Sequence, residues 1–441
     1  MNFTKIKKFR DILIPLVTFG AIVSISALII AYGRGYRLDI IQKQVSPTGL
    51  IAATSDPTGA QILVNGKLES ATNNTLSVDP GWYTVAIAKE GFQTWEKSLR
   101  VQGEVVTRAD AYLFPTNPSL SAVTTNGVVN PSTSPDGGKL AFVIPEAVNS
   151  TSSATTLATR PGIWVLDMTN RPLGLNRDAQ QIAKSSYYDF SNAILNWSPD
   201  SKQIVASVQN PITNKPAYYL LETDKLNDTP KRIFDTDIIS LEWEVIRKIK
   251  EQEKLSILKP EASSVLTPLI NILSFSPEET KILYEATQSA SIPKIISPEL
   301  IGTNPTEEVR DVEPGNIYVY DIKEDRNYLL GTMSDFSVIP QPTPTVIDID
   351  EDLDIQNPYL LDSFLPPLPI QWLPTDRHLM IVSKDKIEAV DYDNTNKKTL
   401  YSGPFEANFV VPWSNASKIL VMTTLNPAAS DYPNLYAVNL R

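Results

Sequence analysis

The sequence contains no cysteine and a single histidine, His378. Without thiols the protein can hold no disulfide, no iron–sulfur cluster and no cysteine-ligated zinc. One imidazole excludes histidine-rich metal sites, and it permits a Ser-His-Asp triad only if His378 supplies the base. Glycine is also scarce, with 18 residues against 34 prolines, which favours extended segments broken by turns. Packing rather than covalent cross-linking must therefore hold this fold together.

Basic residues are outnumbered: 39 lysines and arginines against 50 acids give a net charge of −11. A sequence-independent grip on nucleic acid needs a basic surface, so we expect no nucleic-acid partner. The sequence has no glycine-rich phosphate loop, nucleophile elbow or metalloprotease helix motif, and we expect no cofactor. With 441 residues, of which 42% are hydrophobic, the chain is long enough for two or three globular domains.

One long uncharged segment lies near the N-terminus. Residues 12–32 contain no charge, and as a helix they would span roughly 30 Å, the thickness of a bilayer core. Four basic residues precede this segment and Arg34 and Arg37 follow it, a bias that favours a cytoplasmic N-terminus. We therefore predict a cytoplasmic tail (1–11), a transmembrane helix (12–32), a linker (33–47) and an extracytoplasmic remainder at the cell membrane. A cleaved signal peptide and a buried helix are the alternatives.

Short β-strand patterns follow the linker. Residues 48–115 alternate apolar and polar positions in runs separated by turn residues, which indicates antiparallel strands with one buried face. Asn65 and Gly66 suit a tight hairpin turn. The Pro-Thr-Gly-Ala quartet at 57–60 and the Lys-Glu-Gly-Phe-Gln-Thr-Trp run at 89–95 resemble the PEGA domain family, although the family has Glu in the second position of the quartet. The resemblance implies a small β-sandwich of envelope proteins, with carbohydrate or protein binding and no catalytic residues.

Four aromatic residues of this segment are candidates for ligand binding, because aromatic rings stack on the faces of sugars. They are Trp82, Tyr83, Phe92 and Trp95. The same residues also fit the core or the cross-strand packing of a small sandwich. The sequence does not say which rings point outward, so both roles stay open.

A degenerate repeat occupies the rest of the chain, residues 118–441. A hairpin signal recurs five times: an aromatic or apolar strand end, a turn with Pro, Asp or Asn, and then an apolar strand. A third strand of similar pattern follows each copy, and a fourth follows all but the last. The five hairpins cover residues 134–142, 197–205, 275–283, 372–380 and 413–421.

Four-stranded units repeated in this way predict a β-propeller. Residues 120–124 precede the first hairpin, so we predict that this strand supplies the fourth strand of the last blade and closes the ring. Five blades are predicted, with six as the alternative. The Ser-Pro-Asp-Gly hairpin resembles TolB-type and WD-repeat-like propellers, which implies an architectural rather than a catalytic role for this motif.

Two insertions interrupt the repeat, at about 241–270 and 334–371. In the first, Leu241, Val245 and Ile249 recur at helical spacing, which predicts a helix that packs on a blade, with partner binding as the alternative. The second is rich in proline and acids and is predicted to be an extended loop.

Two groups of residues invite a cation or acid–base interpretation. Asp348, Asp350, Asp352 and Asp354 alternate in the second insertion, but they lack the glycine and the glutamate of an EF-hand loop. A solvated acidic loop is therefore favoured over a calcium site. His378 lies within a hairpin, which favours a turn or blade-surface residue over a catalytic base. We expect no metal site and no catalytic residue.

The order of anchor, PEGA-like domain and propeller resembles a class of PEGA-domain membrane proteins of bacteria. We therefore predict an all-β protein with an N-terminal transmembrane helix. The predicted function is non-enzymatic binding or scaffolding in the cell envelope, with cell-wall polysaccharide or other envelope proteins as partners. One alternative is a carbohydrate-active hydrolase with carboxylates at the propeller axis. Another is a sensor or transport partner that signals through a second membrane protein.

Overall fold

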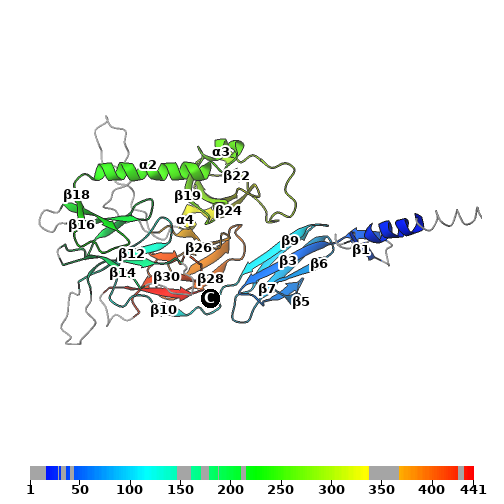
Figure 1. Cartoon of the computed structure of the whole chain (residues 1–441), viewed down its shortest axis with the longest axis horizontal. Coiled ribbons are helices and arrows are strands. Elements are labelled where there is room, and N and C mark those ends of the chain that lie inside the picture. The colour runs from blue at the N-terminus through cyan, green and yellow to red at the C-terminus, as the bar shows by residue number, and fades with distance from the viewer. Residues whose placement is uncertain are drawn as a thin grey trace, which may run out of the picture. The chain divides into compact units, whose positions relative to one another are not determined.

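The structure is a computed structural model of the 441-residue chain (Figure 1). It divides into two compact units. Unit 1 comprises Met1–Leu113 and Ile296–Thr306, and unit 2 comprises Phe114–Ile295 and Glu307–Arg441. The residues that the structure describes are 16–27, 29–30, 36–39, 44–146, 160–169, 178–186, 188–209, 215–336, 367–425 and 432–441.

The N-terminal part of unit 1 is helical at residues 16–27 and 29–30, with exposed side chains. Among the described residues, no helix combines the length and the apolar character that crossing a membrane requires. An antiparallel hairpin of β1 (Tyr36–Asp39) and β2 (Gln44–Pro47) lies within the predicted linker.

The next part of unit 1 is a sandwich of two sheets, as the alternating pattern predicts. One sheet has the order β6-β3-β9 and the other has the order β5-β4-β7-β8. β3 and β9 are parallel, and the other pairings in these two sheets are antiparallel. The strands are β3 (Gly49–Asp56), β4 (Gln61–Val64), β5 (Lys67–Ala71), β6 (Asn74–Val78), β7 (Gly81–Ala88), β8 (Trp95–Val101) and β9 (Val106–Tyr112).

Alternate side chains of these strands fill a single core between the two sheets. Ile51, Ile62 and Val85 belong to it and have no exposed surface. The turn that joins β4 to β5 holds Asn65 and Gly66, both with positive φ, at 50° and 79°. Asparagine and glycine tolerate that backbone region best, so the predicted tight hairpin is confirmed.

Unit 2 contains five four-stranded antiparallel sheets among its described residues, here numbered 1 to 5 along the chain. Sheets 1 to 4 have the orders β11-β12-β13-β14, β15-β16-β17-β18, β19-β20-β23-β24 and β25-β26-β27-β28. This is the strand arrangement of propeller blades, and the predicted four-stranded units are confirmed.

The bounds of these strands follow the repeat closely. Sheet 1 has β11 (Val129–Thr133), β12 (Lys139–Ile144), β13 (Gly162–Asp167) and β14 (Gln180–Lys184). Sheet 2 has β15 (Ile194–Trp197), β16 (Gln203–Gln209), β17 (Pro216–Glu222) and β18 (Lys231–Ile233). Sheet 3 has β19 (Ile270–Phe275), β20 (Lys281–Ala286), β23 (Asn316–Asp321) and β24 (Arg326–Thr332). Sheet 4 has β25 (Ile370–Trp372), β26 (His378–Val382), β27 (Ile387–Asp391) and β28 (Lys398–Tyr401).

Sheet 5 joins the two ends of unit 2 in the order β10-β31-β30-β29. Leu120 of β10 lies opposite Val438 of β31. The prediction that residues 120–124 supply the last sheet with its fourth strand is therefore confirmed, and β31 has a neighbour on both sides. The strands are β10 (Leu120–Ala122), β29 (Val410–Pro412), β30 (Lys418–Thr423) and β31 (Asn434–Asn439).

Apolar clusters connect several of these sheets. Sheets 1 and 2 share a cluster that includes Val143 and Leu195, and sheets 3 and 4 share one that includes Leu283 and Leu379. Sheets 5 and 1 share a third cluster, to which Phe142 belongs. The middle strands are consequently buried on both faces and lack polar alternation, as β12 illustrates.

Helix α2 (Thr236–Leu255) belongs to the first insertion, where a helix is predicted. It begins at Asp235, whose carboxylate accepts hydrogen bonds from N–H groups of the first turn. Its buried residues are Ser240 and Trp243, and Trp243 packs against Val205 of sheet 2. Lys250 Nζ donates to the carbonyl of Pro199, in the turn between β15 and β16 of sheet 2. Lys254 forms an ion pair with Glu279, in the turn between β19 and β20 of sheet 3, so α2 contacts both sheets (Figure 1).

The helix packs on a blade, as predicted, but Leu241, Val245 and Ile249 do not make the contact. These side chains are 53%, 49% and 49% exposed. The helix instead buries the side that carries Trp243, because an indole removes more apolar surface from water than any aliphatic side chain.

The remaining elements are short. They are α3 (Pro260–Leu266), α4 (Met333–Phe336) and the two-stranded pair of β21 (Ala290–Ser291) and β22 (Asp311–Val312). The second insertion contains residues 337–366, which lie outside the described residues together with Asp348, Asp350, Asp352 and Asp354.

Candidate functional site

The four aromatic candidates for ligand binding take different positions in unit 1. Trp95 is 6% exposed and belongs to the core. Tyr83 and Phe92 are partly buried and pack against the same core. Trp82, on β7, is 59% exposed. The core interpretation therefore describes three of these residues, and the ring of Trp82 lies mainly in solvent.

Contacts of Tyr83 and Phe92 explain why they face inward. The Tyr83 hydroxyl donates a 2.8 Å hydrogen bond to the Asp79 carbonyl. Burial, and then the negative charge of Asp79, raise the pKa of Tyr83. The ammonium of Lys89 lies 6.0 Å from the centre of the Phe92 ring and donates to the Thr58 carbonyl at 2.6 Å. Both rings are thus engaged within the sandwich.

An outward surface surrounds Trp82, and we call it the Trp82 face. On this side of the sheet, Trp82 lies opposite Arg100 and Thr84 lies opposite Ser98. Leu68 of β5 is 56% exposed on the same side, since it pairs with the outward Leu63 of β4. Trp82, Thr84, Ser98 and Arg100 are likewise exposed. The face therefore combines a solvent-exposed indole with hydroxyl groups and a guanidinium.

The chemistry of the Trp82 face suits binding rather than catalysis. A large exposed ring offers a stacking surface at a small loss of side-chain entropy. Arg100, Ser98 and Thr84 supply hydrogen-bond donors beside it. This combination of groups provides no activated nucleophile and no paired acid and base.

Unit 2 carries the repeated turn motifs, and their contacts are architectural. In sheets 1, 2 and 3 a motif serine accepts a hydrogen bond from the backbone N–H five residues later, as Ser134 does from Lys139 and Ser276 does from Lys281. Ser134 Oγ also donates to Asp136 at 2.5 Å. Each turn is thereby closed on itself, in agreement with the architectural role that the resemblance implies.

Lysines of two motifs reach the next sheet. Lys139 Nζ donates to the Thr223 hydroxyl of sheet 2 at 2.9 Å. Lys281 Nζ lies 2.9 Å from a carboxylate oxygen of Asp376 in sheet 4, with both side chains about nine-tenths buried. Thr280 Oγ1 and the Glu278 N–H also donate to Asp376. The motif lysines therefore connect neighbouring sheets.

His378 is the first residue of β26 and is 4% exposed, so it is not a surface residue. Its Nδ1 lies 2.8 Å from the Thr375 hydroxyl, and its Nε2 lies 3.3 Å from Asp391 Oδ1. The ring meets the edge of Phe114, with 5.6 Å between ring centres. These contacts connect a turn, a strand and the start of unit 2, which is a structural role.

Replacing His378 with alanine is expected to lower the free energy of unfolding by about 2 kcal/mol, because Asp391 stays buried without the imidazole. Urea denaturation followed by fluorescence measures this loss. An unchanged unfolding midpoint would contradict the structural role.

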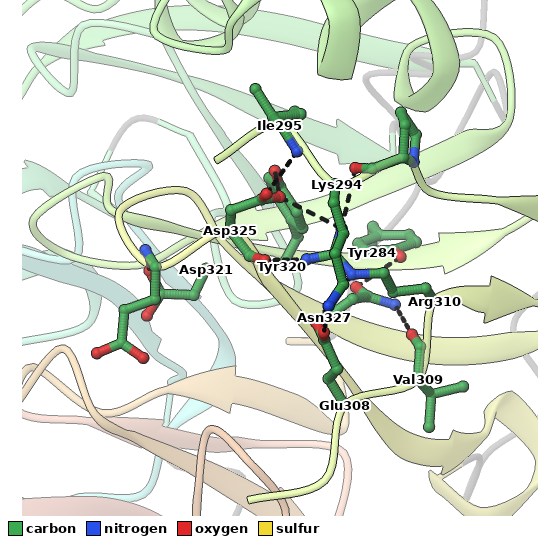
Figure 2. A network of polar contacts seen from close by, with 12 residues as sticks. Tyr284, Lys294, Ile295, Glu308, Val309, Arg310, Tyr320, Asp321, Asp325 and Asn327 are labelled. Atoms are coloured by element: carbon green, nitrogen blue, oxygen red, sulfur yellow. Dashed lines mark hydrogen bonds and ion pairs between the residues drawn. The ribbon is translucent and has the colours of Figure 1, made fainter. Parts of the chain in front are cut away.

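A polar network beside sheet 3, which we call the Arg310 clamp, was not foreseen from the sequence (Figure 2). Arg310 Nε lies 3.0 Å from Glu308 Oε2, and its NH1 lies 3.4 Å from Asp325 Oδ1. The guanidinium also donates to the backbone carbonyls of Pro293 and Asp325. Burial opposes the charge, but the two carboxylates raise the pKa of Arg310 above its ordinary value.

Asp325 is the centre of this clamp and is 4% exposed. Its carboxylate accepts hydrogen bonds from Tyr320 OH at 2.9 Å and from the Ile295 N–H at 2.6 Å. Beside it, Asn327 donates to the Val309 carbonyl at 2.7 Å (Figure 2). The clamp therefore ties residues that precede and follow segment 296–306 to one turn of sheet 3.

The clamp pairs its charges internally, since the Arg310 guanidinium lies within ion-pair distance of both Glu308 and Asp325, so its arrangement is structural. Its members are close in space because β23 and β24 form a hairpin, while Arg310 arrives from a separate segment. No motif spacing marks such a meeting. Among the described residues, no group of three or more His, Asp or Glu side chains is arranged to hold a metal ion.

Comparisons with known proteins bear on both units. Residues 48–117 match the PEGA domain family. A search of curated proteins found no match. Among solved structures, a protein described as TolB from Agrobacterium tumefaciens is 13% identical, with 70% of this chain and 71% of that chain covered and a TM-score of 0.19. TolB from Acinetobacter baumannii is 11% identical, with 77% and 54% covered and a TM-score of 0.19. Hydrazine synthase from Kuenenia stuttgartiensis is 11% identical, with 92% and 99% covered and a TM-score of 0.17.

Likeness at these TM-scores supports no conclusion about the function of unit 2. The fold of unit 2 follows from its own strand pairing. For unit 1, the family match and the observed sandwich agree with the resemblance found in the sequence. The chain therefore contains a PEGA domain at residues 48–117.

Proposed function

We propose that this protein is a membrane-anchored binding or scaffold protein of the bacterial cell envelope, without catalytic activity. The observation that carries the proposal is the Trp82 face, an exposed indole on the outer surface of a PEGA domain. In this proposal residues 12–32 form a single membrane span with the N-terminus in the cytoplasm, which the absence of charge in this segment supports. The sandwich and unit 2 then lie outside the membrane.

Cell-wall polysaccharide is the ligand class that suits the Trp82 face. The apolar faces of sugar rings stack on an indole, and sugar hydroxyls accept hydrogen bonds from groups such as Arg100 and Ser98. The exposed face of a sheet is open along its length, which fits a polymer better than a small molecule. An envelope protein is the other partner class for the same surface.

Unit 2 is the scaffold in this proposal, with its five sheets closed into a five-bladed propeller. The packing of sheet 5 on sheet 1 and the pairing of β10 with β31 support closure. Closure removes exposed strand edges, so the ring presents turns and loops to its surroundings.

Replacing Trp82 with alanine in the full-length protein is expected to weaken binding to purified cell-wall polysaccharide about tenfold or more, the equivalent of ~1.4 kcal/mol. Co-sedimentation with the insoluble polymer measures the affinity. The thermal midpoint should not change, because the ring is mainly in solvent.

Phe234 provides a matched control, since it is an exposed aromatic residue of unit 2 at 85% exposure. Phe234→Ala should bind as the unaltered protein does. Equal binding by the Trp82 variant would remove the Trp82 face from the proposal. Release of soluble sugars from the polymer by the unaltered protein would contradict the absence of catalysis.

A further inference from the structure

Helix α2 carries an apolar face that the rest of the described chain does not cover. Ile238, Leu241, Val245 and Ile249 are 63%, 53%, 49% and 49% exposed, and we call them the α2 stripe. Their spacing of three and four residues places them on one side of the helix, over a length of roughly 16 Å. The opposite side of the helix carries the buried residue Trp243. A continuous apolar stripe on a helix that is already packed marks an interaction surface.

We propose that the α2 stripe binds the α2 stripe of a second copy of this chain, with the two helices antiparallel. Ile238 and Ile249 are eleven residues apart, which is close to three full turns. A twofold axis between Leu241 and Val245 therefore places Ile238 of one copy against Ile249 of the other. The same patch then serves both copies, and the assembly closes as a dimer.

The charges along α2 select the antiparallel direction. Asp237 and Lys248 flank the stripe on one side and are also eleven residues apart, so the twofold axis brings Asp237 of each copy to Lys248 of the other. Residues 235–244 contain four acids and no base, whereas residues 245–254 contain four bases and two acids. A parallel pair would place like charges together.

Contacts within one copy leave Lys248 suited to this role. Lys250 and Lys254 are directed toward sheets 2 and 3. Lys248 pairs with Glu244 at 2.7 Å, but its side chain is 69% exposed. Its ammonium is therefore accessible to the Asp237 carboxylate of a second copy, next to Glu244, whose own side chain is 15% exposed.

The absence of cysteine makes a direct test possible, because each introduced thiol is the only one in the chain. Full-length Asp237→Cys and Lys248→Cys proteins are treated separately and as a mixture with a short thiol-specific cross-linker. Cross-linked dimer is expected in the mixture at several times the yield of either protein alone. Equal yields in all three samples, or a monomeric mass by sedimentation, would overturn the proposal, as would a dimer that forms only through Lys248→Cys alone.

Two further variants separate docking from folding. Leu241→Glu with Val245→Glu should abolish cross-linking of the mixture while the thermal midpoint stays unchanged, since both side chains are exposed. Ile257→Glu is the matched control, because Ile257 is 51% exposed outside the stripe, and it should cross-link normally.

Asp237→Lys or Lys248→Asp alone should weaken the dimer, and the two together in one chain should restore it. Failure of the double variant to restore it would refute the antiparallel charge pairing.

Discussion

Replacing Arg310 with methionine is expected to lower the free energy of unfolding by about 3–5 kcal/mol. Methionine matches the length of the arginine stem but removes the charge that neutralises Asp325. Asp325 is 4% exposed, and the Tyr320 hydroxyl and the Ile295 N–H, which also donate to it, carry no charge. A buried carboxylate without a counter-charge destabilises a fold much more than an intact pair stabilises it. Urea denaturation at neutral pH, followed by fluorescence, measures the change.

Two further proteins show whether charge is the cause. Arg310→Met combined with Asp325→Asn removes the uncompensated charge, so it should be more stable than Arg310→Met alone. Lys225→Met deletes an exposed ion pair with Glu222, and the unfolding midpoint should not move because solvent screens such pairs. If Arg310→Met behaves like Lys225→Met, the clamp does not hold sheet 3 together.

Replacing Lys281 with methionine is expected to lower the free energy of unfolding by a similar amount at pH 7, about 3–5 kcal/mol. Lys281 lies between two buried acids: it contacts Asp376 at 2.9 Å, and its charge also opposes the raised pKa of Asp321. Burial is the largest influence on both acids and by itself raises the pKa of each. Hydrogen bonds and the Lys281 charge nevertheless hold the pKa of Asp376 below its ordinary value of 3.8.

This destabilisation should depend on pH. In the unaltered protein the lowered pKa of Asp376 gives stability that is fully present above pH 3.8 and is lost as the pH falls further. Without Lys281, burial dominates and the pKa of Asp376 rises, so the variant gains relative stability when its acids are protonated. The stability difference between the two proteins should therefore be smaller at pH 4 than at pH 7. A difference that is the same at both pH values would contradict the charge argument.

Lys139 is the matched control, because it occupies the same position of the motif in sheet 1 but donates to the Thr223 hydroxyl and to a backbone carbonyl of sheet 2. Lys139→Met leaves no buried acid in sheet 2 without a partner. Its effect on unfolding should be smaller than that of Lys281→Met, with a weaker dependence on pH.

Local patterns predicted the elements of this fold well. The five hairpins of unit 2 and the tight turn at Asn65 and Gly66 depend on turn chemistry and strand alternation, which act over a few residues. The pairing of residues 120–124 with the last sheet was also predictable. The last repeat lacks its fourth strand, and one additional strand precedes the first repeat, so the two were expected to pair.

The candidate sites were predicted less well. Alternation along β7 implies that Trp82 and Tyr83 face opposite sides, but it does not say which side is the core. That choice depends on the second sheet of the sandwich, which covers Tyr83 and leaves Trp82 in solvent. The side of α2 that packs depends on the tertiary structure for a related reason. The periodicity of Leu241, Val245 and Ile249 predicts the helix, but the side that is buried is the one that carries Trp243.

The sequence by itself determined most of the strands, the turns and the PEGA domain at residues 48–117. Tertiary structure alone decided which apolar side chains stay in solvent and which charges meet. The physical reason is that burial and ion pairing depend on segments distant along the chain. Arg310 and Asp325 are fifteen residues apart, and Lys281 and Asp376 are ninety-five apart, so no local pattern records their contact.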